Sequence, residues 1–314
     1  MTPYPSPHLP GLRGCDLDRC SERRTDTAWL TSLHADADWL PIWRYRGVIM
    51  DGTARRFRLD ELSATPARPI FLGLDRARAD HPVFCFDASD DSDLAERHRF
   101  ADLRGAMPVM KSADGALLAY ARAMIYWHRQ HRHCGRCGHL TESHSGGHVL
   151  HCGACDTEHY PRSDPSMLCL VTDPAGRALL GRKPEWPRTL FSGLAGFAEP
   201  GETLEDCVAR EVWEEARVRV TAMRYVTSQP WPFPASVLFG YMAESAGEAP
   251  QTAQDELAEA HWFSRADFAQ RMAERELHIP PRFTLSRLLI NIWFDAGDGP
   301  TLDELYGDPP QRSS

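Results

Sequence analysis

The spacing of apolar residues predicts a long helix followed by strands in the middle of the chain. Between residues 117 and 128 apolar side chains recur every three or four positions, as on a helix with one buried face, and Asp114 is its expected cap. Two apolar runs, 167–171 and 178–180, flank the sequence DPAG at 173–176 and predict a β-hairpin.

Helices and strands then alternate as far as residue 296. Thr203, with Asp206 three residues later, is typical of a helix start, and Ser264 can cap a second helix. Strands are expected at 224–227, 237–242 and 260–263, and a last helix from about 283 to 294. This alternation predicts an α/β domain over residues 163–296.

The chain before this domain has a different pattern. Short strand-like runs, such as 83–86, lie among acidic turns and predict an α+β domain at 31–130 that ends in the long helix. The first 30 residues are rich in proline, glycine and arginine, so we expect a loosely ordered lead-in there. Residues 297–314 are expected to form a C-terminal tail.

Composition narrows the class of protein. The 314 residues are 42% hydrophobic and 25% charged, as in globular proteins with two or three compact units. The net charge of −9 argues against a broad basic surface for duplex nucleic acid, although local basic patches remain possible. No apolar run is as long as a membrane span, and the N-terminus lacks the apolar segment of a signal peptide. We therefore expect a cytoplasmic protein with no membrane partner.

Four of the nine cysteines form two close pairs, Cys134-Gly-Arg-Cys137 and Cys152-Gly-Ala-Cys155. Two such CxxC turns joined by a short β-ribbon place four thiolates within tetrahedral reach of one zinc ion. Two redox pairs are the alternative, but a four-cysteine structural zinc explains the spacing better. Histidines between the pairs lack a regular ligand spacing. We therefore predict a zinc ribbon at 131–162 that holds one zinc per chain.

The segment from Arg210 to Glu215, REVWEE, concentrates negative charge on one helix. Glu211 faces both Glu214 and Glu215, and like charges at this spacing repel by roughly 0.2–0.5 kcal/mol per pair. Clustered carboxylates are the oxygen ligands that Mg²⁺ and Mn²⁺ prefer. An exposed acidic helix face is the structural alternative. It does not explain why Glu202 stands at the entrance of the helix, after a loop with two glycines and a proline.

The stretch GFAEPGETLEDCVAREVWEEARV, from Gly196 to Val218, resembles the Nudix box. Eight specified positions agree with that pattern: Gly196, Glu202, Arg210, Glu211, Val212, Glu214, Glu215 and Val218. One position differs, because Arg217 stands where the family has the glycine that ends the helix. The resemblance implies the α/β fold class, with a Nudix α/β/α sandwich built on a mixed sheet. The four-cysteine zinc ribbon and the N-terminal α+β domain precede this sandwich.

A second motif, SQPWPFPAS at 228–236, follows the box. Its three prolines alternate with aromatic residues and make a stiff loop that can hold rings in place. A proline-rich partner ligand is the alternative, but the segment lies between two predicted strands. Together with the ribbon, the motif resembles the NADH pyrophosphatase subfamily of Nudix hydrolases, which includes bacterial enzymes that remove NAD caps from RNA. This implies hydrolysis of the NAD(H) diphosphate to AMP and nicotinamide mononucleotide, and a homodimer.

The same resemblance assigns roles to individual residues. Glu211 and Glu215 would be the main ligands of catalytic Mg²⁺ or Mn²⁺, with Glu256 and the carbonyl of Ala195 completing the site. Glu214 would be a ligand or the water-activating base, and Arg210 would brace a glutamate by a bidentate pair. Tyr160 and Phe197 would stack on substrate rings, as would Trp231. The substrate-contacting positions are Gln229, Pro230, Trp231, Pro232, Phe233, Pro234, Ala235, Ser236 and Ser286.

Two other functions stay open on the sequence. One is a Nudix hydrolase of another nucleoside diphosphate derivative, against which the SQPWPFPAS loop argues. The other is a non-catalytic zinc-ribbon sensor that binds nucleic acid, against which the intact glutamates argue. Arginines near the ribbon, Arg122, Arg129, Arg132 and Arg136, can guide an RNA tail or can be solvated surface.

Overall fold

The computed structural model describes residues 12, 14–62, 64–252 and 256–306, and it divides the chain into two compact units. The N-terminal unit comprises the described residues up to 163 together with 231–235. The C-terminal unit comprises residues 164–230 and the described residues from 236 onward. Among the described residues, no helix is long and apolar enough to cross a membrane.

The C-terminal unit is built on one mixed sheet, in the strand order β14-β15-β11-β12-β16, with β13 also paired to β11. β11 runs parallel to β15 and antiparallel to β12 and β13. The strands are β11 (Asp164–Thr172), β12 (Ala178–Arg182), β13 (Leu194–Phe197), β14 (Val220–Trp231), β15 (Ser236–Ser245) and β16 (Glu259–Phe263).

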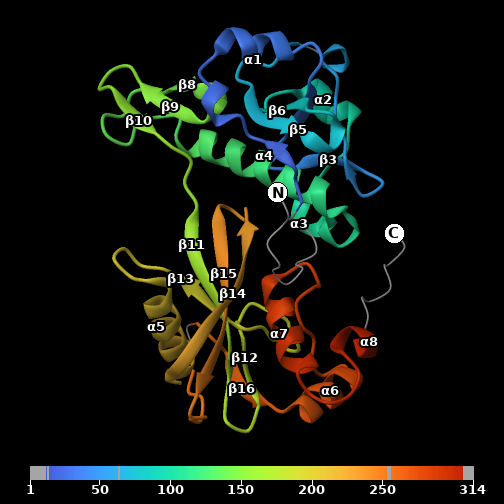
Figure 1. Cartoon of the computed structure of the whole chain (residues 1–314), viewed down its shortest axis with the longest axis vertical. Coiled ribbons are helices and arrows are strands. Elements are labelled where there is room, and N and C mark those ends of the chain that lie inside the picture. Colours follow the sequence, from blue (N-terminus) through green and yellow to red (C-terminus); the bar gives the residue numbers. More distant parts are fainter. Residues whose placement is uncertain (1–11, 13, 63, 253–255, 307–314) are drawn as a thin grey trace. The chain divides into compact units, whose positions relative to one another are not determined.

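Helices cover both faces of this sheet, because side chains alternate along β11. Met167 and Cys169 pack with the apolar side of α5 (Leu204–Ala216). Leu168 and Leu170 pack on the other side with α6 (Arg265–Ala273) and α7 (Leu285–Asp295). Figure 1 shows α5 on one side of the sheet and α6 and α7 on the other. The predicted α/β/α sandwich with a mixed sheet is confirmed.

The local signals in this unit are confirmed as well. β11 and β12 form the predicted hairpin, with Val171 opposite Leu179. The hydroxyl oxygen of Thr203 accepts a hydrogen bond from the backbone N–H of Asp206 at 3.1 Å, so Thr203 caps α5. Ser264 caps α6 in the same way. The helix α5 ends at Arg217, whose backbone is left-handed with φ of 56° although it is not glycine. This conformation costs a non-glycine residue about 1 kcal/mol.

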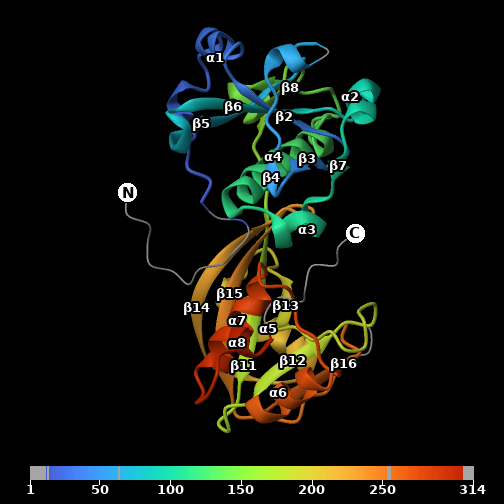
Figure 2. The ribbon, with the colours of Figure 1, turned by 90° about the vertical axis from the view of Figure 1, so that its right-hand side faces the viewer.

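The N-terminal unit contains a four-stranded sheet, β1-β5-β6-β2, a smaller sheet, β4-β3-β7, and the ribbon sheet, β10-β9-β8. Its long helix α4 packs across β2, β5 and β6 (Figure 1; Figure 2). The strands are β1 (Leu17–Asp18), β2 (Asp38–Ile42), β3 (Gly47–Met50), β4 (Thr53–Ala54), β5 (Ile70–Asp75), β6 (His81–Asp87), β7 (Phe100–Ala101), β8 (Glu142–His144), β9 (Val149–Cys152) and β10 (Thr157–His159). The helices are α1 (Thr27–Leu33), α2 (Ser92–Arg97), α3 (Leu103–Ala106) and α4 (Ser112–Gln130).

Three predictions about the chain ends and caps differ from the structure. In the predicted lead-in, β1 pairs with β5, and Leu30 on α1 is buried in the core; residues 1–11 and 13 lie outside the described part. Asp114 does not cap α4, which begins at Ser112; its carboxylate lies 3.8 Å from the guanidinium of Arg56. The predicted tail contains α8 (Leu302–Tyr306), anchored by buried Leu302, and only 307–314 lie outside the described residues.

The ribbon is joined to the N-terminal sheet by close contacts. The ring of His148 donates from Nε2 to the carbonyl oxygen of Phe71 at 2.8 Å, and His128 on α4 bonds to the carbonyl of Gly147 at 2.7 Å. Gly147 has a φ of +89°, and a Cβ there would lie 2.9 Å from Ile70. A glycine is therefore needed at this contact, and the ribbon and the N-terminal domain form one packed body.

Candidate active site and zinc site

One cation, Arg210 on α5, holds three of the carboxylates of the box. Its guanidinium makes a bidentate pair with Glu202, at 2.6 and 2.9 Å. Nη1 also donates to Glu211 at 3.0 Å and to Glu214 at 2.9 Å. The hydrogen bonds from Arg210 lower the pKa of Glu202 to about 2. The mutual repulsion expected within REVWEE is therefore offset by an internal arginine, and the predicted bidentate brace is made with Glu202.

Glu215 faces the interior of the unit. It is 3% exposed, and its Oε2 accepts a hydrogen bond from the backbone N–H of Ala195 at 3.2 Å. Burial raises the pKa of Glu215 to about 8, against the opposing charge of Lys183. Burial also raises the pKa of Glu211, although Arg210 opposes this. A cation placed between these carboxylates would favour their ionised forms.

Gly196 allows Glu211 to lie against strand β13. A Cβ built at position 196 would stand 1.8 Å from the carboxyl carbon of Glu211 and 2.0 and 2.1 Å from its oxygens. The carboxylate therefore occupies the space that any side chain at 196 would fill. This close approach places Glu211 next to the segment that also binds Glu215 through Ala195.

Two more charged residues act on this site. The negative charge of Glu256, which precedes β16, raises the pKa of both Glu211 and Glu215. Lys183, which follows β12, is the main positive charge that lowers the pKa of Glu215. Lys183 was not identified from the sequence, and its only signal was a basic pair at the end of a buried strand. The other member of that pair, Arg182, is bound by Glu259 at 2.6 Å.

The donor chemistry of this site fits a divalent cation. Glu211, Glu215, Glu256 and the Ala195 carbonyl offer oxygen atoms only, which suits a hard metal ion. Glu211 and Glu214 are turned toward Arg210, and among the described residues only four cysteines already have their ligand atoms within 4.8 Å of one another. A metal ion would therefore compete with Arg210 for Glu211.

Gln229 and Ser286, among the predicted substrate-contacting residues, are buried and form hydrogen bonds within the fold. Gln229 is 2% exposed; its amide donates to the carbonyl of Phe283 at 2.6 Å and accepts from the N–H of Leu285 at 2.8 Å. Ser286 is buried on α7, where its hydroxyl contacts that of Ser192 at 2.7 Å and accepts from the N–H of Gly193 at 3.2 Å. Both side chains join the start of α7 to the strands or loops of the sheet.

The predicted stacking residues fall into separate places. Phe197, at the end of β13, is 57% exposed in the C-terminal unit, and Tyr160 is 50% exposed in the N-terminal unit. Trp231 and Phe233 lie edge to face, with ring centroids 5.1 Å apart. Within the N-terminal unit these two rings also contact Arg104 and Arg122, at 5.6 and 4.9 Å. The remaining residues of this loop vary in exposure: Pro232 and Ser236 are buried, Ala235 is half-buried, and Pro230 and Pro234 are exposed.

The zinc site has the geometry that the sequence predicts. The four sulfur atoms of Cys134, Cys137, Cys152 and Cys155 all lie within 4.8 Å of one another. Glycine allows the tight turn of the first pair, since Gly138 has a φ of +78°. The hydroxyl of Thr157, 3.2 Å from Cys155, lowers the pKa of that thiol to about 6. These four cysteines therefore fit a structural zinc ion.

One neighbour of the zinc site was not predicted. Nε2 of His159 lies 3.3 Å from the sulfur of Cys134, and the backbone N–H of Arg136 donates to the same sulfur at 3.4 Å. His159 follows the second cysteine pair, outside the stretch between the pairs where the sequence showed histidines. It supports a thiolate ligand by a hydrogen bond, as outer-shell residues of metal sites do.

Comparison with known proteins agrees with this arrangement. Three family models match: a NUDIX domain at residues 162–283, an NADH pyrophosphatase-like rudimentary NUDIX domain at 37–127, and an NADH pyrophosphatase zinc ribbon domain at 129–160. The second match covers a region for which the sequence motifs carried no resemblance.

Relatives match over most of their length. The NAD-capped RNA hydrolase NudC of Stutzerimonas stutzeri is 37% identical over 68% of this chain and 73% of that protein. The NAD-capped RNA hydrolase NudC of Pseudomonas syringae pv. tomato is 36% identical over 70% of this chain and 82% of that protein. A crystal structure of a NUDIX hydrolase from Nitrosomonas europaea matches 47% of this chain and 97% of its own, at 22% identity and a TM-score of 0.37. Together, the matched relatives and the three domains place this chain in the Nudix hydrolase family, among the members with an NADH pyrophosphatase zinc ribbon.

Proposed function

We propose that the protein hydrolyses the diphosphate bond of NAD(H) and removes NAD caps from RNA. The observation that carries the proposal is the pairing of buried Glu215, whose pKa is raised to about 8, with the Glu211 carboxylate packed on Gly196. Burial of ionised carboxylates without a bound cation is unfavourable for folding. Two such groups side by side therefore indicate a site that binds a cation. The names of the relatives supply the substrate class.

The residues divide the work as follows. Glu211 and Glu215 would be the main ligands of Mg²⁺ or Mn²⁺, together with Glu256 and the Ala195 carbonyl. When bound, the metal ion neutralises phosphate charge and lowers the pKa of water. Arg210 keeps the box glutamates in one orientation through its hydrogen bonds. Glu214, partly exposed and held by Arg210, would be a further ligand or the base that takes a proton from water.

The reaction adds the oxygen of water to one phosphorus and leaves the bridging oxygen on the other. NAD(H) would give AMP and nicotinamide mononucleotide, and NAD-capped RNA would give a 5′-monophosphate end. Stacking of substrate rings on Phe197, Tyr160 and Trp231 would add affinity. Contacts from the loop at 229–236 and from Ser286, a homodimer and a cytoplasmic location also remain predictions; light scattering tests the dimer.

The test gives purified protein NADH, NAD⁺, NAD-capped RNA and ADP-ribose side by side, with Mg²⁺ or Mn²⁺. We expect reduced nicotinamide mononucleotide from NADH and the oxidised form from NAD⁺ and NAD-capped RNA, detected by mass spectrometry. The Glu215→Gln variant is the control: it keeps the shape and the acceptor for Ala195 N–H, so it should fold, but it should lose at least about a hundredfold in turnover. Faster turnover of ADP-ribose than of any NAD substrate, or none in the parent, would refute the proposal.

A further inference from the structure

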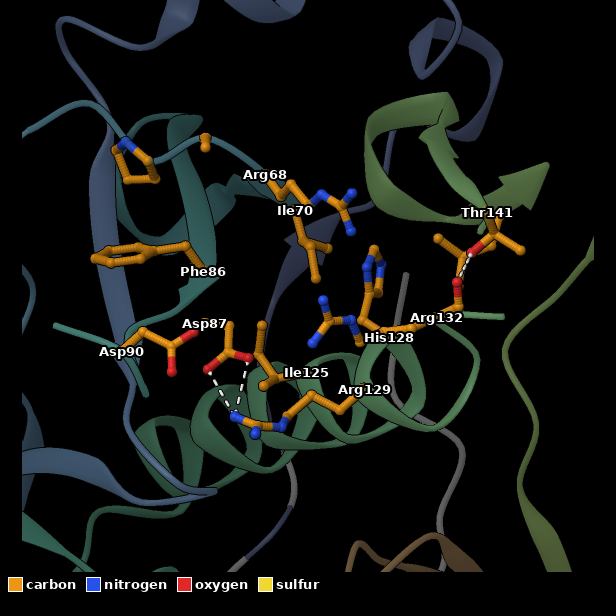
Figure 3. Close-up of a pocket in the computed structure, with 13 residues that line it drawn as sticks. Arg68, Ile70, Phe86, Asp87, Asp90, Ile125, His128, Arg129, Arg132 and Thr141 are labelled. Atoms are coloured by element: carbon orange, nitrogen blue, oxygen red, sulfur yellow. Dashed lines mark hydrogen bonds and ion pairs between the residues drawn. The ribbon is translucent and has the colours of Figure 1, made fainter. Parts of the chain in front are cut away.

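A hollow in the N-terminal unit lies outside the carboxylate site. Its cavity measures about 270 Å³, and it is walled by the N-terminal sheet, by α4 and by the zinc ribbon. Figure 3 shows arginine side chains reaching into it from different elements. Its apolar wall is made by Ile70, Phe86, Ile125 and Leu150. The hollow therefore combines apolar surface with positive charge.

The positive charge of the hollow is largely unpaired. Arg129 is neutralised by Asp87, whose two oxygens lie 3.2 and 3.4 Å from its Nη1. Arg68 and Arg132, in contrast, make no side-chain hydrogen bond or ion pair with any described residue of the chain. Figure 3 shows their guanidinium groups on either side of the His128 ring, with Asp90 away from them beside Phe86. Two guanidinium groups are thus available for an anionic ligand.

His128 adds a neutral acceptor to the same place. Its Nε2 donates to the carbonyl of Gly147 at 2.7 Å, which leaves Nδ1 with its lone pair. Burial lowers the pKa of His128, and the charge of Arg68 lowers it further, which favours the neutral ring. An acceptor between two cations suits a ligand that carries both phosphates and hydrogen-bond donors.

A second hollow, of about 610 Å³, also has Ala67 and Arg68 in its lining. The lining of the second hollow includes the hydroxyl groups of Thr25, Thr27 and Ser143 and also the carboxylate of Glu142. Arg68 therefore borders both hollows.

We propose that the first hollow binds a short single-stranded stretch of RNA. Arg68 and Arg132 would contact successive phosphates, and a base would lie on the apolar wall of the first hollow, as in other single-strand sites. A duplex does not fit, since its bases are already stacked and paired. The choice of RNA rests on the proposed function, whereas the site itself does not, because binding here needs no hydrolysis.

The experiment measures binding of a fluorescent, unstructured RNA octamer with a 5′-monophosphate, by anisotropy and without divalent metal. The octamer carries no cap, so the result is independent of catalysis. The parent is compared with Arg68→Ala, Arg132→Ala and the double variant. Arg46→Ala is the matched control, since Arg46 is an exposed arginine of the same unit that lines neither hollow.

Each phosphate contact to single-stranded RNA contributes about 0.7 to the salt slope, or about fivefold in affinity at 0.1 M salt. The double variant should therefore bind about 25-fold more weakly, with a slope reduced by about 1.4, while it hydrolyses free NADH like the parent. Arg46→Ala should bind within about twofold of the parent. A parent that does not bind the octamer, or equal losses in the double variant and Arg46→Ala, would overturn the inference. Those results would leave the proposed hydrolysis untouched.

Discussion

Replacement of Gly196 by alanine tests whether the position of Glu211 limits catalysis. The new Cβ would stand 1.8 Å from the carboxyl carbon of Glu211, where ordinary contacts begin at 3.4 Å. The φ of Gly196 is not positive, so alanine is compatible with the backbone and the carboxylate has to move. The shift exceeds 1 Å, and a misplacement of that size costs about a hundredfold in rate. We expect kcat/KM for NADH to fall about a hundredfold, or about 2.7 kcal/mol.

The fold should survive this substitution. Alanine stabilises a compatible glycine position by about 0.4–1 kcal/mol through the unfolded chain, which offsets part of any local strain. Thermal unfolding should therefore shift by only a few degrees. Gly105→Ala is the matched control, because nothing lies within 4 Å of its new Cβ, and it should leave kcat/KM unchanged.

A double-mutant cycle decides whether the loss acts through Glu211. If Gly196→Ala only displaces that carboxylate, then adding it to Glu211→Gln should cost little more than Glu211→Gln alone. Independent effects would instead multiply, so the double variant would lose at least a further hundredfold or so. Multiplying losses, or full activity in Gly196→Ala, would refute the reasoning from close contact.

Three further predictions concern zinc, pH and the aromatic loop. Purified protein should contain about one zinc per chain by elemental analysis; Cys152→Ser should lose it, whereas Cys15→Ser should keep it. Burial lowers the pKa of His148 to about 4, below the 6.5 of an exposed ring, so the unfolded chain binds more protons and stability falls as pH drops. Between pH 7 and 5 this group should lower the free energy of unfolding, measured in urea, by about 2 kcal/mol. The variant His148→Gln keeps a donor for the Phe71 carbonyl, and its free energy of unfolding should fall by about 2 kcal/mol less over the same pH range. Trp231→Ala should lower kcat/KM for NADH about ten- to a hundredfold if a base stacks there, but much less for a diphosphate substrate without a second base; equal losses would assign Trp231 to the fold.

The sequence predicts best those features that are encoded locally. The alternation of apolar residues along 167–171 gives β11 and both of its faces, and Thr203 and Ser264 begin their helices through contacts only three residues away. The cysteine pairs are equally local, because each CxxC turn sets its own geometry. These elements were therefore predictable without knowledge of the rest of the chain.

Long-range contacts explain what the sequence did not show. Gln229 is a polar residue beside an aromatic loop, and only the approach of Phe283 and Leu285, more than fifty positions away, makes it a buried link. Lys183 acts on the site only because its charge lowers the pKa of Glu215, which lies on another element. Polar side chains carry no local mark of burial, since the same residue is stable in water or with buried partners.

The single body formed by the ribbon and the N-terminal sheet has a consequence for how the protein responds to metal supply. Zinc binding contributes about 10–16 kcal/mol to small zinc domains at neutral pH, comparable with the roughly 5–15 kcal/mol that keeps a whole domain folded. The contacts of His148 with Phe71 and of Gly147 with Ile70 couple the stability of the ribbon to that of β5. Both hollows, which Arg68 borders, are walled partly by the ribbon. Loss of zinc would therefore unfold the part of the ribbon that lines both hollows. The carboxylate cluster belongs to the other unit and would keep all of its own contacts.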